Sequence, residues 1–133
     1  MKTILFSGRF DRYHIAHNIT LARLAQRYDQ VIVVVLDYKE AMFPIEERVE
    51  TISNALLTTK GNFQIIVSPH HFGKITDEQL DEFPHFDVYG SGNKKVLEHI
   101  TRLGKKTEFV PRYPKHAASD DVKYQKIKRI MDE

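Results

Sequence analysis

Short apolar runs rich in β-branched residues alternate along the chain with stretches whose apolar positions recur at helical spacing. Runs of the first kind predict strands, and they cover residues 3–6, 30–36, 63–67, 86–89 and 107–110. Stretches of the second kind predict helices, and they cover residues 15–28, 45–58, 76–83, 94–103 and about 119–131. The run at 30–36 is apolar from its second residue onward, which is typical of a central parallel strand buried on both faces.

Five repeats of strand followed by helix predict an α/β fold, a Rossmann-like five-stranded parallel sheet flanked by helices on both faces. Ligands of such sheets bind at the carboxyl ends of the strands, at the point where the strand order reverses. The loops after the first, fourth and fifth strands are therefore the places to look for a site. The chain length of 133 residues fits a single domain over 1–133.

Composition narrows the class of protein. Apolar residues make up 41% and charged residues 29%, as in ordinary globular proteins, and the formal net charge of +2 does not favour nucleic acid as a partner. The absence of cysteine excludes disulfides, thiolate nucleophiles and cysteine zinc sites. No apolar run approaches the roughly 20 residues that cross a bilayer, and no secretory signal is evident. We expect a cytoplasmic protein without a membrane partner.

The first loop carries the strongest chemical pattern. The first strand ends at Ser7 and Gly8, and the next helix begins near His14. A helix N-terminus offers unpaired N–H groups and partial positive charge to an anion. Because His14 and His17 are three residues apart, they share a face of the first helical turn and could donate to phosphate oxygens. A metal site on this pair would need a third ligand, and none stands at a suitable spacing, so no protein metal site is predicted.

Residues 8–17 read Gly8-Arg9-Phe10-Asp11-Arg12-Tyr13-His14-Ile15-Ala16-His17. This segment resembles the signature of the HIGH-type nucleotidyltransferase superfamily, Gly-x-Phe-Asp-x-x-His-x-Gly-His, and departs from it at Ala16, where the family has Gly. The resemblance implies that an acceptor phosphate attacks the α-phosphorus of a nucleoside triphosphate and pyrophosphate leaves. It also implies that His14 and His17 are catalytic, that Gly8, Arg9, Phe10, Asp11 and Ala16 bind the nucleotide, and that Mg²⁺ is held mainly by the triphosphate.

Three cations in other loops are candidates for the acceptor or for phosphate. Lys39 follows the second strand, and Arg48 matches the arginine of a Glu-Arg helix start that cytidylyltransferases and archaeal-type nicotinamide mononucleotide adenylyltransferases carry. Lys74 lies near a histidine pair after the third strand and is a weaker candidate. The alternative interpretation of each cation is a solvated surface charge.

The loop after the fourth strand includes Gly90 and Asn93. Two glycines here would permit a tight turn close to a ligand, and an asparagine can both donate to and accept from a base edge. In the resembling families this loop lies against the base or ribose, so both residues are predicted to bind nucleotide. The same letters are also ordinary turn chemistry.

The segment after the fifth strand resembles that of glycerol-3-phosphate cytidylyltransferases. Arg112 matches their Pro-Arg and is a catalytic candidate, while Ser119 and Lys123 are candidates for nucleotide binding at the last helix. The family's hydroxyl run is largely missing, since Ala117 and Ala118 stand in its place.

Within the superfamily, the preferred interpretation is transfer of CMP from CTP to a phosphorylated small molecule. The alternative is an adenylyltransferase that uses ATP with nicotinamide mononucleotide or a similar acceptor. A nucleotide-binding protein with lost catalysis is the rival from another class. The sequence leaves the acceptor undetermined, and relatives of this kind allow a homodimer.

Overall fold

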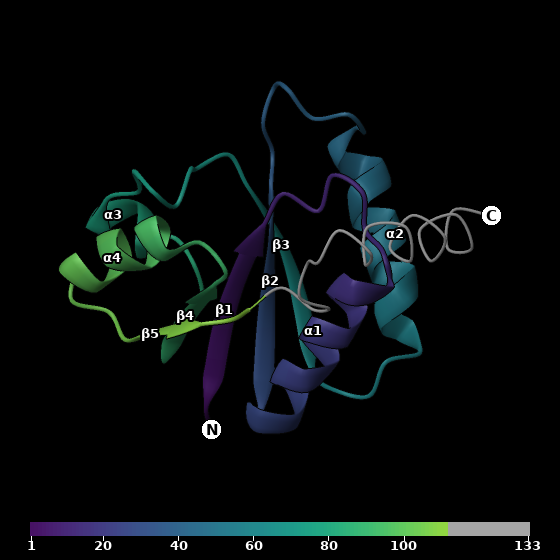
Figure 1. Cartoon of the computed structure of the whole chain (residues 1–133), viewed down its shortest axis with the longest axis horizontal. Helices are drawn as coiled ribbons and strands as arrows, with labels where there is room; N and C mark the ends of the chain where they lie inside the picture. Colours follow the sequence, from purple (N-terminus) through teal and green to yellow (C-terminus); the bar gives the residue numbers. More distant parts are fainter. Residues whose placement is uncertain (112–133) are drawn as a thin grey trace, which may run out of the picture.

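The computed structural model, which describes residues 1–111, has five strands in one parallel sheet (Figure 1). The strands lie in the order β3-β2-β1-β4-β5, and every neighbouring pair is parallel. Their bounds are β1 Thr3–Gly8, β2 Gln30–Leu36, β3 Phe63–Ser68, β4 Val88–Ser91 and β5 Thr107–Phe109. The predicted Rossmann-like sheet is confirmed. The predicted helix at about 119–131 lies outside the described residues.

Helices cover both faces of the sheet, α1 (Ile15–Arg27) and α2 (Ile45–Leu57) on one and α3 (Asp77–Leu80) and α4 (Lys94–Arg102) on the other (Figure 1). The alternation of side chains along β2 explains the two layers. Odd-numbered residues of β2 pack with α1 and α2 in a cluster that includes Val31, Val33, Val35, Leu21, Leu24 and Ile52. Even-numbered ones pack with α3 and α4 in a cluster that includes Ile32, Val34, Leu80 and Ile100.

The fourth strand begins two residues later than the apolar pattern predicts. Asp87 does not extend β4, because its carboxylate accepts a hydrogen bond from the Thr3 N–H at 2.8 Å. The first N–H of β1 is therefore satisfied by a side chain. Gly90 consequently lies inside β4, opposite Phe6 of β1. A Cβ at Gly90 would lie 2.9 Å from Cδ1 of Ile4. The prediction that Gly90 belongs to a ligand-binding turn is therefore wrong, since its missing side chain makes room for the core.

The sheet order reverses between β1 and β4. The chain runs outward from β1 through β2 to β3 and then returns to place β4 on the other side of β1. The loops that leave the carboxyl ends of β1 and β4 consequently turn to opposite faces of the sheet, which opens a crevice between them. Within residues 1–111, no helix is long and apolar enough to span a membrane.

Candidate active site

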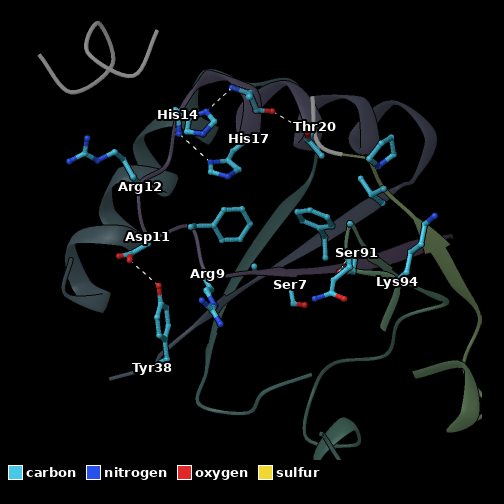
Figure 2. Close-up of a pocket in the computed structure, with 18 of the residues that line it drawn as sticks. Ser7, Arg9, Asp11, Arg12, His14, His17, Thr20, Tyr38, Ser91 and Lys94 are labelled. Carbon is cyan, nitrogen blue, oxygen red and sulfur yellow. Dashed lines mark hydrogen bonds between the residues drawn. The ribbon is translucent and has the colours of Figure 1, made fainter. Parts of the chain in front are cut away.

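A cavity of about 910 Å³ lies at the carboxyl ends of β1 and β4, where the strand order reverses (Figure 2). Its walls come mainly from the loop between β1 and α1 and the loop between β4 and α4. The predicted residues that line it are Gly8, Arg9, Phe10, Asp11, His14, Ala16, His17 and Asn93. The structure therefore brings most of the signature segment together around one pocket.

The signature loop is built around the ring of Phe10. This residue is 4% exposed and has a φ of 45°, which is costly for a residue with a side chain. Its ring lies over Gly8, where an added Cβ would be 3.0 Å from Cε2 and Cζ of Phe10. Gly8, which was predicted to bind nucleotide, lines the cavity, and its missing side chain also makes room for the Phe10 ring. The edge of that ring also meets His17, with ring centroids 5.3 Å apart.

The two histidines form the N-terminal cap of α1. Nδ1 of His14 accepts a hydrogen bond from the Ala16 N–H, and Nδ1 of His17 accepts one from the His14 N–H, both at 3.3 Å. The rings stack with centroids 4.2 Å apart, and His14 is only 7% exposed. In a neutral imidazole whose Nδ1 accepts, the proton is on Nε2. The cap therefore selects the tautomer in which each histidine has an Nε2–H donor.

Asp11 connects the signature loop to the loop after β2. Its carboxylate accepts hydrogen bonds from the backbone N–H groups of Met42 and Phe43 at 2.9 and 3.1 Å and from the Tyr38 hydroxyl at 2.9 Å (Figure 2). Partial desolvation acts to raise the pKa of Asp11, but these donors and the nearby Arg48 outweigh it and lower the pKa. The carboxylate that was predicted to bind nucleotide is thus largely used by the protein itself.

Arg48 is buried rather than facing a ligand. It is 3% exposed, and its Nη1 donates to the carbonyl oxygens of Arg9 and Leu36 at 2.7 Å while its Nε donates to Phe43 O at 3.1 Å. The predicted contact of Arg48 with the acceptor or with phosphate therefore does not match its place in the structure, and the surface-charge alternative is equally wrong.

Lys39 and Lys74 are exposed and do not line the cavity.

The end of β4 and the first turn of α4 supply residues that the sequence did not single out. Ser91, Lys94 and Lys95 line the cavity beside Asn93. Asn93 caps α4, with Oδ1 accepting from the Lys95 N–H at 3.0 Å and the Val96 N–H at 3.4 Å. Because its oxygen is used by the helix, Asn93 has its amide NH₂ to offer a ligand, so it would donate rather than accept. In the sequence, Lys94 and Lys95 directly follow the turn at Gly92 and Asn93, and this pattern could have predicted a positively charged wall.

The floor of the cavity is held by a buried tyrosine. Tyr89 of β4 is fully buried, and its hydroxyl lies 2.5 Å from Oγ of Ser7 at the end of β1. Burial raises the pKa of Tyr89 to about 12, so the hydroxyl stays protonated at neutral pH. This hydrogen bond joins the two strand ends from which the binding loops depart.

The charge of the cavity favours an anion. The helices that begin at its rim, α1 and α4, have no acidic residue in their first turns, whereas α2 and α3 each have two. Acidic side chains there would compete with an anionic ligand for the helix N-termini. The charged residues in the described lining are the cations Arg9, Arg12, Lys94 and Lys95 and the single carboxylate of Asp11. The predicted Arg112, Ser119 and Lys123 lie outside the described residues.

A parallel sheet with a cationic cavity at its reversal point, and with two histidines capping a helix at its rim, is an α/β arrangement suited to binding phosphate groups. The family described as Cytidylyltransferase-like matches residues 5–70, a range that begins within β1 and includes the signature segment, β2 and β3. This match and the relatives described next are consistent with the HIGH-type nucleotidyltransferase superfamily.

Similar proteins span most of the chain. It is 27% identical over 119 residues to nicotinamide-nucleotide adenylyltransferase 1 of Sulfolobus acidocaldarius, covering 82% of this chain and 68% of the relative. It is 26% identical over 140 residues to the nicotinamide-nucleotide adenylyltransferase of Methanothrix thermoacetophila, covering 100% and 80%. The fold matches the crystal structure of the lipopolysaccharide core biosynthesis protein from Thermoplasma volcanium with a TM-score of 0.60 and 23% identity, covering 85% of this chain and 98% of that one.

Proposed function

We propose that this protein is an adenylyltransferase that transfers AMP from ATP to a phosphomonoester, with nicotinamide mononucleotide as the first acceptor to test. The observation that supports ATP is that both relatives described above are adenylyltransferases by name and align with 82% and 100% of this chain. The preference for CTP reached from the sequence therefore gives way to its alternative. The reaction class, nucleotidyl transfer, is unchanged.

In the proposed reaction, an oxygen of the acceptor phosphate attacks the α-phosphorus of ATP in line. A new phosphoanhydride bond forms, the bond between the α-phosphorus and the bridging oxygen breaks, and pyrophosphate leaves with the electron pair. The Nε2–H groups of His14 and His17 would donate to phosphate oxygens that gain charge in the transition state. Because the acceptor phosphate is already ionised at neutral pH, no side chain has to remove a proton.

Mg²⁺ would be carried into the site by the triphosphate. Asp11 is the one carboxylate in the described lining of the cavity, and its oxygens accept hydrogen bonds from Tyr38, Met42 and Phe43. Among residues 1–111, no group of three or more histidine, aspartate or glutamate side chains is arranged to hold a metal ion. Binding through triphosphate oxygens and water suits an ion that retains several waters, and it would reduce the repulsion between two anionic substrates.

A pyrophosphate-release assay tests the proposal. The full chain is incubated with Mg²⁺ and either ATP or CTP, in combination with nicotinamide mononucleotide, glycerol 3-phosphate and further phosphomonoesters. We expect release with ATP and nicotinamide mononucleotide. Release with CTP alone would restore the cytidylyl-transfer interpretation. Binding of a nucleoside triphosphate without pyrophosphate release for any acceptor would favour the binding-only rival and contradict the proposed enzyme.

A further inference from the structure

We propose that Tyr38 is a positioning residue that holds the guanidinium of Arg9 at the wall of the cavity, where it binds a phosphate of the nucleotide. The proposal rests on the function proposed above and adds to it a residue outside the signature segment. Tyr38 follows β2 and is far from Arg9 in sequence, yet both side chains line the same cavity.

The contact between the two side chains is a cation–π interaction. Cζ of Arg9 lies 4.9 Å from the centroid of the Tyr38 ring, and Figure 2 shows the guanidinium beside that ring. Arg9 is exposed, and within residues 1–111 its side chain forms no ion pair with a carboxylate. An exposed arginine loses considerable rotamer entropy when a ligand fixes it. A neighbouring ring that already restricts the side chain reduces that loss and leaves the N–H groups to bind phosphate.

Tyr38 is itself fixed from two sides. Its hydroxyl donates to Oδ2 of Asp11 at 2.9 Å, and Cζ of the buried Arg48 lies 5.4 Å from the centroid of its ring. Partial desolvation and the neighbouring Asp11 raise the pKa of the Tyr38 hydroxyl, so it remains a donor at neutral pH. A ring that is anchored at its hydroxyl end by a carboxylate is a rigid support for Arg9.

The backbone of Arg9 is anchored by the same group of residues. Nη1 of Arg48 donates to the Arg9 carbonyl at 2.7 Å, and Asp11 holds the loop two residues further on. Arg48 thus fixes the position of the Arg9 backbone, and Tyr38 fixes the position of the Arg9 guanidinium. Tyr38, Asp11 and Arg48 contact one another, and Tyr38 and Arg48 also contact Arg9. These contacts explain how an exposed arginine is held in a defined place.

A double-mutant cycle on Mg-ATP binding tests this role. The variants are Tyr38→Leu, Arg9→Ala and the double variant, with calorimetric Kd values as the readout. Tyr38→Leu removes the ring, and we expect it to weaken ATP binding about two- to fivefold, which is the size of an exposed cation–π contact. Arg9→Ala is expected to weaken binding about tenfold or more. Adding Tyr38→Leu to Arg9→Ala should weaken binding no further, because Tyr38 acts through Arg9.

The conservative variant Tyr38→Phe separates positioning from general damage to the fold. It keeps the ring between Arg9 and Arg48 but loses the hydroxyl bond to Asp11, so its ATP affinity should fall by less than that of Tyr38→Leu, about twofold at most. An equal loss from Tyr38→Leu with and without Arg9 would overturn the proposal, as would a Tyr38→Phe variant as weak as Tyr38→Leu. Wild-type protein that binds ATP but never releases pyrophosphate would overturn the proposed function alone. Wild-type protein that binds no nucleoside triphosphate would overturn both.

Discussion

At the scale of single residues, each of the two histidines caps a helix with one ring nitrogen and, in the proposed reaction, would donate to phosphate with the other. Nδ1 of His14 and Nδ1 of His17 accept backbone N–H groups at the start of α1, so these nitrogens cap the helix. The cap determines which nitrogen carries the proton and leaves Nε2–H as the donor. Histidine is not among the usual N-cap residues, and here two histidines fill the capping box of one helix.

Asparagine substitution separates the two roles of His17. His17→Asn provides an amide oxygen that can replace Nδ1 in the cap, but it removes the Nε2–H donor. We expect the variant to unfold within a few degrees of wild type and its turnover to fall by about 10²- to 10³-fold, the effect of losing one transition-state donor. His17→Ala should lose as much turnover and in addition about 1 kcal/mol of stability, because the cap acceptor is gone.

The measurements are kcat from pyrophosphate release and a thermal unfolding midpoint for each variant. His71→Asn is the matched control, since His71 is exposed, lies outside the cavity and also accepts a backbone N–H through Nδ1. It should keep wild-type turnover. Wild-type turnover in His17→Asn would show that Nε2 of His17 does not take part in the reaction.

At the scale of elements, a buried arginine joins α2 to the loops of the site. Arg48 lies in the first turn of α2 and donates to carbonyl oxygens at the end of β2, in the signature loop and just before its own helix. Its donors are on two separate nitrogens, Nε and Nη1, whereas a lysine would have to reach all three carbonyls from one nitrogen. Asp11 ties the same two loops with its carboxylate. The site is therefore held by long-range polar contacts as well as by the sheet.

Arg48→Lys should destabilise the protein although it conserves the charge. Lysine would leave at least one buried carbonyl without a donor, and we expect the free energy of unfolding to fall by about 1–3 kcal/mol in urea denaturation. Arg102→Lys is the matched control, because Arg102 is exposed on α4 and its hydrogen bond within residues 1–111 is to Glu98 of its own helix. It should change stability by less than about 0.5 kcal/mol. Equal effects of the two substitutions would contradict the anchoring role of Arg48.

At the scale of the whole molecule, three carboxylates join segments that are distant in sequence. Asp87 accepts from the Thr3 N–H, Glu108 accepts from the Tyr28 hydroxyl at 2.5 Å and also pairs with Arg27, and Asp11 joins the two loops of the site. The pKa of Asp87 is lowered mainly by its backbone hydrogen bond. For Glu108 and Asp11, desolvation opposes the shift, but their hydrogen bonds and nearby positive charge lower the pKa.

These lowered pKa values predict that acid destabilises the fold. A carboxyl group whose pKa is lower in the folded state contributes stability above its unfolded pKa and loses it as the pH falls through the folded pKa. The free energy of unfolding should therefore be nearly constant from pH 7 to about pH 5 and fall below about pH 4. Urea denaturation from pH 7 to pH 3 measures this fall. The double variant Asp87→Asn, Glu108→Gln should show a shallower fall, and a slope equal to that of wild type would contradict the assignment.

Local patterns in the sequence determined most of the helices and strands and pointed to the histidine pair of the candidate site. The bounds of β2 were predictable because its apolar residues pack against both layers. The helix predicted over 76–83 corresponds to the shorter α3, whose capping box of Thr76 and Gln79 is a local motif. His14 and His17 could be named as candidates because the signature that contains them lies within the short segment 8–17. Each of these features depends on residues that are close in sequence.

Only the tertiary structure decided the roles of Tyr38, Arg48, Gly90 and Asp11. Their partners lie on other elements, such as Arg9 for Tyr38 and Ile4 for Gly90. A cation such as Arg48 gives the same sequence signal whether it faces a phosphate or three carbonyl oxygens. The physical reason is that helical and strand periodicity are local, whereas burial and hydrogen-bond partners are set by how the loops of β1, β2 and β4 meet at one edge of the sheet.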